Sequence, residues 1–85
     1  MYQVIFTKKA LKSLKKIPVE YQSKIKSASK KLSLNPFDLD IRKLNSSYKA
    51  THRLRVGDYR LFLQIDTTLK TIYIADLDRR TTQTY

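Results

Sequence analysis

The residues of this sequence best suited to chemistry are three arginines, Arg53, Arg55 and Arg60. They lie on either side of Gly57-Asp58, within two runs of residues that alternate between polar and apolar. A Gly-Asp pair between two such runs predicts a β-hairpin with a two-residue loop, which would place Arg55 opposite Arg60. Because side chains alternate along a strand, the arginines would share one face. The apolar residues would share the other: Leu54, Val56, Tyr59, Leu61 and Leu63.

Arginines gathered on one strand face indicate a polyanionic ligand. Two arginines directly opposite each other on neighbouring strands repel, which lowers the stability of a sheet. A guanidinium, however, offers a planar fork that binds two phosphate oxygens at once. The hairpin is therefore either an ordinary solvated strand face, which is the commoner case on spacing alone, or a surface that binds a nucleic-acid backbone. Internal pairing of these arginines with Asp58, Asp76 or Asp78 would weaken the second interpretation.

Few side chains of this sequence could transfer a proton near neutral pH. His52 is the only histidine, and histidine is the one side chain whose ordinary pKa lies near neutrality. Alternation places His52 on the Leu54 face, which favours a half-buried structural role. The sequence contains no cysteine, which excludes a disulfide, a thiolate nucleophile and a thiolate metal site. Because the aspartates are scattered along the chain, the sequence predicts no metal site and no cofactor.

Two helices and four strands are predicted to position the arginines. Residues 2–6 form a short strand, and Thr7 is suited to cap the helix that follows. The first helix has apolar residues at helical spacing and ends at Pro18. The second runs from about Val19 to Leu34 and ends at Asn35-Pro36. Residues 36–47 are a connector, and the remaining strands cover residues 48–55, 59–65 and 71–75.

This order predicts one α+β domain of residues 1–85. It consists of an N-terminal strand, an antiparallel helix hairpin and a three-stranded antiparallel segment. The two helices would pack on one face of a four-stranded sheet. The opposite face, which carries the arginines, would be open to a ligand.

The charge of the chain points to an anionic partner. Its 85 residues include 18 Lys and Arg but only 7 Asp and Glu, for a net charge of +11. Such a charge favours nucleic acid, an anionic membrane or an acidic protein. No apolar run approaches the roughly 20 residues that cross a bilayer, and the N-terminal residues lack the layout of a signal peptide. We therefore expect a cytoplasmic protein.

Several residues resemble a known family over nearly the whole chain. Lys43-Leu44, Tyr48, the segment Arg53 to Arg60 (RLRVGDYR), Arg79 and Tyr85 are similar to the RelE/ParE toxin superfamily. Its members are the toxins of toxin–antitoxin pairs, and a partner antitoxin, usually acidic where it wraps the toxin, holds them inactive. The RelE-like branch cleaves mRNA in the ribosomal A site, whereas the ParE-like branch inhibits DNA gyrase.

The resemblance implies a catalytic set and a set of RNA contacts. Arg60 and Arg79 would bind the scissile phosphate, Arg53 would position or stabilise it, and Tyr85 would stack on a base or orient the 2′-OH. The implied RNA contacts are Lys43, Lys49, Arg55 and Arg80. Two residues depart from the family pattern: Thr51 stands where a lysine is common, and Asp78 stands where a basic residue or histidine is common.

The resemblance favours a ribosome-dependent endoribonuclease that needs no metal. An RNA 2′-OH would attack the adjacent phosphate and expel a 5′-OH, a reaction that requires proton transfer and stabilisation of extra negative charge. Two alternatives remain: a ParE-like gyrase inhibitor that acts by binding, and a basic homologue that binds RNA or the ribosome with weak catalysis. The expected partners are a cognate antitoxin, the ribosome and mRNA, with no membrane.

Overall fold

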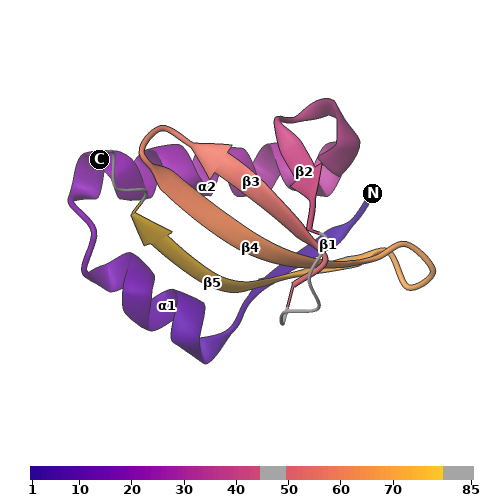
Figure 1. The fold of residues 1–85 in the computed structure, drawn as a ribbon, viewed down its shortest axis with the longest axis horizontal. Coiled ribbons are helices and arrows are strands. Elements are labelled where there is room, and N and C mark those ends of the chain that lie inside the picture. The colour runs from indigo at the N-terminus through magenta and orange to yellow at the C-terminus, as the bar shows by residue number, and fades with distance from the viewer. Residues whose placement is uncertain (45–49, 80–85) are drawn as a thin grey trace.

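The computed structural model describes residues 1–44 and 50–79. The elements follow one another as β1 (Gln3–Phe6), α1 (Lys8–Lys15), α2 (Val19–Leu34), a short 3-10 turn η1 (Pro36–Asp38), β2 (Ile41–Lys43), β3 (His52–Val56), β4 (Tyr59–Asp66) and β5 (Thr71–Arg79) (Figure 1). Within the described ranges, no helix combines the length and the apolar character needed to cross a membrane.

The strands form one mixed sheet in the order β1-β5-β4-β3-β2. β1 runs parallel to β5, and the other neighbours are antiparallel. The predicted α+β architecture is confirmed, but the sheet has one strand more than the four predicted, because β2 lies inside the predicted connector. The sequence Ile-Arg-Lys of β2 is too short for a clear alternation signal, and its pairing with β3 stabilises it as a strand.

The hairpin of β3 and β4 has the predicted register. Its pairs are Val56 with Tyr59, Arg55 with Arg60, Leu54 with Leu61 and Arg53 with Phe62. Gly57 has a φ of +60°, a backbone conformation that glycine adopts without the steric cost of a Cβ atom. The turn sequence therefore determines which residues share the arginine face.

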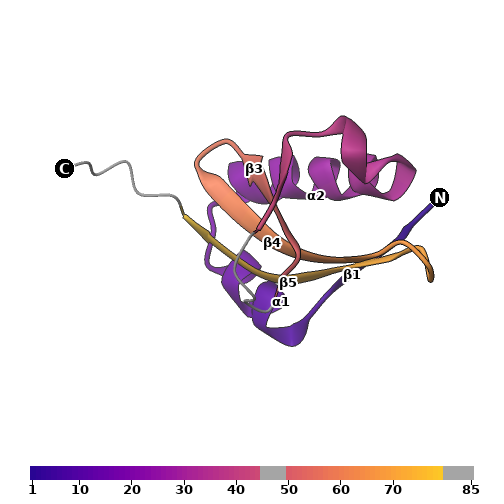
Figure 2. The same ribbon diagram turned by 45° about the vertical axis from the view of Figure 1, so that its right-hand side comes forward.

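Both helices pack against the sheet. The hydroxyl of Thr7 accepts a hydrogen bond from the backbone N–H of Ala10 at 3.2 Å, which confirms the predicted cap of α1. α1 contacts β5 and β1, and α2 contacts β1 and β3. In Figures 1 and 2, α1 lies beside β5. α2 lies apart from α1 and extends along the sheet.

The core lies between the helices and one face of the sheet. Leu61 and Leu63 of β4 and Ile74 of β5 are fully buried, as are Ile25 and Leu32 of α2. Burying each of these large side chains stabilises the fold by about 1.5–3 kcal/mol. Because side chains alternate along the strands, the neighbours of these residues project from the opposite face.

β5 contains a β-bulge next to the arginine face. Leu63 pairs with Ile74, but Phe62 pairs with Asp76, so Ala75 has no partner on β4. The hydroxyl of Thr7 donates to the carbonyl oxygens of Ala75, at 2.9 Å, and Ile74, at 3.2 Å. A one-residue bulge changes which residues of the following strand face each side of the sheet. The cap of α1 is thus tied to the point where β5 changes register.

Candidate nucleic-acid interface

Four arginines from three strands lie on the sheet face away from the core. Arg42 of β2 pairs with Arg53 of β3, and Arg55 of β3 pairs with Arg60 of β4. Arg42, Arg53 and Arg55 line a small cleft of about 30 Å³ together with Asp40. The structure therefore brings together the predicted Arg53, Arg55 and Arg60. It adds Arg42, which sequence reasoning missed because β2 was not predicted.

Arg60 is paired with an acid on the same face. Its Nε donates to Oδ1 of Asp78 and its Nη2 donates to Oδ2, both at 3.0 Å. The two side chains are 33% and 46% exposed. The Arg60 guanidinium also lies 5.8 Å from the ring centre of Phe62. Asp78 thus binds one edge of the Arg60 guanidinium, which was assigned to the phosphate from the sequence. This internal pairing weakens the prediction that the arginine face binds a nucleic-acid backbone.

The remaining predicted residues lie elsewhere. Arg79 pairs with the buried Tyr59, so its position in β5 belongs to the core-side face rather than the face of Arg60. Lys43 pairs with His52 and likewise lies on the side away from Arg53. Three further predicted residues, Lys49, Arg80 and Tyr85, lie outside the described residues.

His52 and Thr51 have structural contacts at the start of β3. His52 Nδ1 lies 2.8 Å from the Thr51 hydroxyl, and the imidazole meets the ring of Phe37 edge-on at 6.1 Å. Partial burial, and then the positive charge of Lys43, lower the pKa of His52 below its ordinary value of 6.5. The predicted position on the Leu54 face is confirmed, since His52 pairs with the core residue Leu63. His52 is therefore a neutral, half-buried side chain on the opposite face of the sheet from Arg53.

Thr51 connects β3 to β4 where relatives of the predicted family often have lysine. Its hydroxyl accepts from the backbone N–H of Ile65 at 3.1 Å and lies 3.3 Å from the carbonyl oxygen of Leu63. Its backbone N–H donates to the same carbonyl at 2.8 Å. The Thr51 side chain therefore has a structural role, because its hydrogen bonds join the start of β3 to β4.

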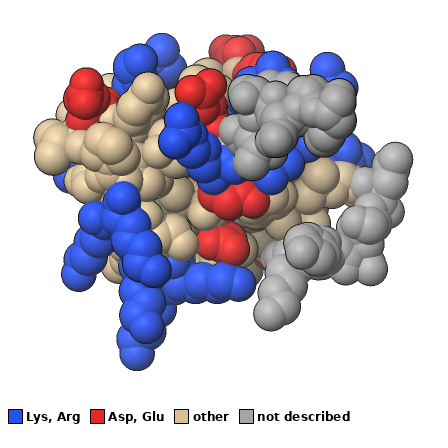
Figure 3. Space-filling model, turned by 60° about the vertical axis from the view of Figure 1, so that its left-hand side comes forward, with Lys and Arg blue, Asp and Glu red and all other residues tan. Residues whose placement is uncertain are grey.

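In Figure 3, basic side chains project at several places on the visible surface, with a few acidic side chains between them. Asp76 accepts from α1, through Ser13 at 3.4 Å and Lys9 at 3.4 Å. Within residues 1–44 and 50–79, no cluster of three or more histidine, aspartate or glutamate side chains could hold a metal ion. On the sheet face away from the core, the charged groups are arginine guanidiniums with the carboxylates of Asp76 and Asp78 beside them.

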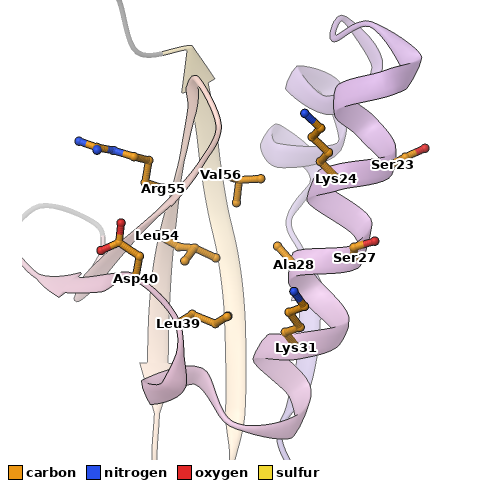
Figure 4. A pocket seen from close by; sticks show the side chains of 10 residues that line it. All are labelled: Ser23, Lys24, Ser27, Ala28, Lys31, Leu39, Asp40, Leu54, Arg55 and Val56. Atoms are coloured by element: carbon orange, nitrogen blue, oxygen red, sulfur yellow. The ribbon is translucent and has the colours of Figure 1, made fainter.

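A groove of about 500 Å³ separates α2 from β3. Leu54 and Val56 point across it toward Ala28 of α2, whereas Arg55 points away (Figure 4). Lys24 and Lys31 of α2 also line it. An apolar floor beside two lysines suits a segment that carries both apolar and acidic side chains.

Comparison with known proteins identifies relatives of this fold. A family model described as the ParE toxin of the type II toxin–antitoxin system parDE matches residues 4–83. The RelE–RelB complex from Pyrococcus horikoshii OT3 is 26% identical, with a TM-score of 0.82 over 96% of this chain and 98% of that chain. The RelBE2 complex from Mycobacterium tuberculosis is 30% identical, with a TM-score of 0.83 over 93% and 98%.

The isolated RelE toxin of E. coli shares the fold alone. It is 16% identical, with a TM-score of 0.78 over 98% of this chain and 88% of that chain. A search of curated protein sequences finds no match.

Proposed function

The chain belongs to the RelE/ParE superfamily of toxins from type II toxin–antitoxin systems, and from this premise we propose that it is an endoribonuclease that cleaves mRNA on the ribosome. The observation that carries the proposal is the open sheet face with Arg42, Arg53, Arg55 and Arg60 in two directly opposed pairs. Opposed arginines lower the stability of a sheet. A bound phosphate backbone offsets that repulsion, because each guanidinium gains a charge-assisted hydrogen bond.

In the proposed reaction these groups stabilise the negative charge that develops at the phosphate. The RNA 2′-oxygen bonds to phosphorus, and the bond to the 5′-oxygen breaks. The products are a 2′,3′-cyclic phosphate and a 5′-hydroxyl, after one proton has left the 2′-OH and another has reached the 5′-oxygen. Arg60 and Arg53 bind the phosphate oxygens, where preorganised donors contribute most to rate. By the family resemblance, Tyr85 orients the 2′-OH. Arg79, which the resemblance also assigns to the phosphate, pairs with Tyr59 on the opposite face of the sheet and is given no part in this step.

A second candidate function is inhibition of DNA gyrase by binding alone. The pairing of Arg60 with Asp78 favours it, because it reduces the positive charge at the position that cleavage needs. The match to the ParE family model is compatible with it as well.

For the antitoxin partner, we propose that a segment with apolar and acidic side chains docks in the groove between α2 and β3. The P. horikoshii and M. tuberculosis relatives are complexes of toxin with antitoxin. Reversing the charge of the groove lysines, in a Lys24→Glu/Lys31→Glu variant, should weaken antitoxin binding at least tenfold, since like charges across an interface are strongly unfavourable. Lys26 and Lys30 are exposed on the same helix outside the groove. Their double Glu variant is the matched control, and an equal loss in both variants would contradict this docking site.

Induced expression in bacterial cells tests the proposed function. The wild-type chain should halt protein synthesis and produce mRNA cuts in register with codons, while DNA stays intact. Arg60→Ala should remove most of the cuts without changing the melting temperature by more than a few degrees, because Arg60 lies outside the core. A DNA-damage response with uncut mRNA would instead establish the gyrase function.

A further inference from the structure

Asp78 holds the guanidinium of Arg60 in a fixed direction. The contact is side-on, with Nε and Nη2 donating to the two carboxylate oxygens at 3.0 Å each. The ring of Phe62, two residues along β4, lies 5.8 Å from the same guanidinium. One contact restrains the edge of the group and the other restrains its face, so the plane of the guanidinium is set by its neighbours.

The contact with Asp78 leaves the N–H groups at the end of the Arg60 guanidinium, which form a second fork, available to another ligand. A guanidinium has five N–H donors, and Asp78 takes one from Nε and one from Nη2. The end of the group still carries a parallel pair, one N–H from Nη1 and one from Nη2. No partner for these donors lies among the described residues. A second anion can therefore bind end-on while Asp78 stays in place.

The position of Asp78 depends on the β-bulge. From the β4–β5 turn up to the pair of Leu63 with Ile74, the strands pair in one register, and beyond Ala75 they pair in another. Without this extra residue Leu77 would stand opposite Arg60, and Asp78 would belong to the core-side face. Bulges re-aim side chains and occur often beside active sites. The carbonyls of Ile74 and Ala75 are held by the Thr7 hydroxyl, so the arrangement is built into the fold.

We propose that Asp78 is a positioning residue that aims the end-on fork of Arg60 at an RNA phosphate, an inference that rests on the proposed endonuclease function. Asp78 has two opposing effects on the reaction. Its negative charge repels the RNA backbone and weakens binding. Its two hydrogen bonds with Arg60 keep the end-on pair of N–H groups directed at the phosphate. The guanidinium therefore does not have to reorient when negative charge develops there. The stabilising effect of so exposed an ion pair on the fold is small.

The two effects predict a split between affinity and rate. In Asp78→Asn, the single carboxamide oxygen can accept from Nε or from Nη2 but not from both, so the two-point contact is lost at nearly constant side-chain size. Binding of a short single-stranded RNA, followed by fluorescence anisotropy, should be unchanged or a few-fold tighter. The single-turnover rate of mRNA cleavage on saturating ribosomes should fall about tenfold or more, since misplaced catalytic groups cost up to about a hundredfold. Glu20→Gln, an equal change of charge at an exposed site on α2, should leave both values unchanged.

A double-mutant cycle tests whether Asp78 acts through Arg60. Arg60→Ala and the double variant Arg60→Ala/Asp78→Asn should cut at the same residual rate, because Asp78 then has no group to aim. Asp78→Glu keeps the carboxylate and should recover part of the rate even if Asp78→Asn folds poorly. A wild-type rate in Asp78→Asn, or an equal further loss in the Arg60→Ala background, would overturn the positioning role alone. A wild-type protein that cuts no mRNA would overturn the proposed function and this inference together.

Discussion

Replacing two of the clustered arginines should change how RNA binding depends on salt. Each phosphate contact to single-stranded nucleic acid contributes about 0.7 to the slope of log affinity against log salt. A variant with Arg53→Gln and Arg55→Gln loses up to two contacts, so its slope should be shallower by about 1.4. Between about 50 and 200 mM salt, wild-type affinity should therefore fall about sevenfold more than that of the variant.

Fluorescence anisotropy with a labelled single-stranded RNA, titrated at several salt concentrations, measures both slopes. The variant should fold at least as well as wild type, because it relieves the opposed pairs Arg42 with Arg53 and Arg55 with Arg60. The matched control is Lys26→Gln/Lys30→Gln, which removes the same charge from the exposed surface of α2. An unchanged slope in the arginine variant, or an equal change in the lysine control, would refute the idea that the open sheet face binds the backbone.

Three further predictions concern stability and are tested by urea denaturation. Because the folded protein lowers the pKa of His52, the unfolded chain binds more protons as pH falls below 6.5, so stability should decrease from there toward the folded pKa. His52→Gln should reduce this dependence, and an identical pH profile would contradict the assignment. Gly57→Ala should cost about 1 kcal/mol, because φ is +60° while no atom lies within 4 Å of the added Cβ; a much larger loss would indicate a clash. Leu61→Ala should cost about 2–5 kcal/mol, since Leu61 is fully buried, and a loss below 1 kcal/mol would contradict the core position.

The hairpin could be predicted from the sequence because its signals are local. Gly57-Asp58 sets the turn, and alternation on both sides sets the faces, so the register of Arg55 with Arg60 follows from residues that are close in sequence. The start of α1 follows in the same way from Thr7 and the start of α2 from Pro18, whereas α1 ends at Lys15, before its predicted end at Pro18.

β2 and the partner of Arg60 depend instead on contacts between distant residues. The three residues of β2 become a strand through pairing with β3, which no short window of sequence contains. Asp78 faces Arg60 because Ala75 is an unpaired bulge residue held by Thr7, far away in the sequence. The spacing of the apolar residues in β5 does indicate the bulge, since Ile72, Ile74 and Leu77 are two and then three residues apart. That break in the period also places Arg79 opposite Tyr59 rather than beside Arg60.

Incubating the purified chain with mRNA-programmed ribosomes is the most direct test of the proposed nuclease. Primer extension should map cuts at codons in the A site, with a 5′-hydroxyl on each downstream fragment, and Arg60→Ala should produce far fewer. Uncut mRNA from active ribosomes, together with loss of supercoiling by DNA gyrase in a parallel reaction, would contradict the account.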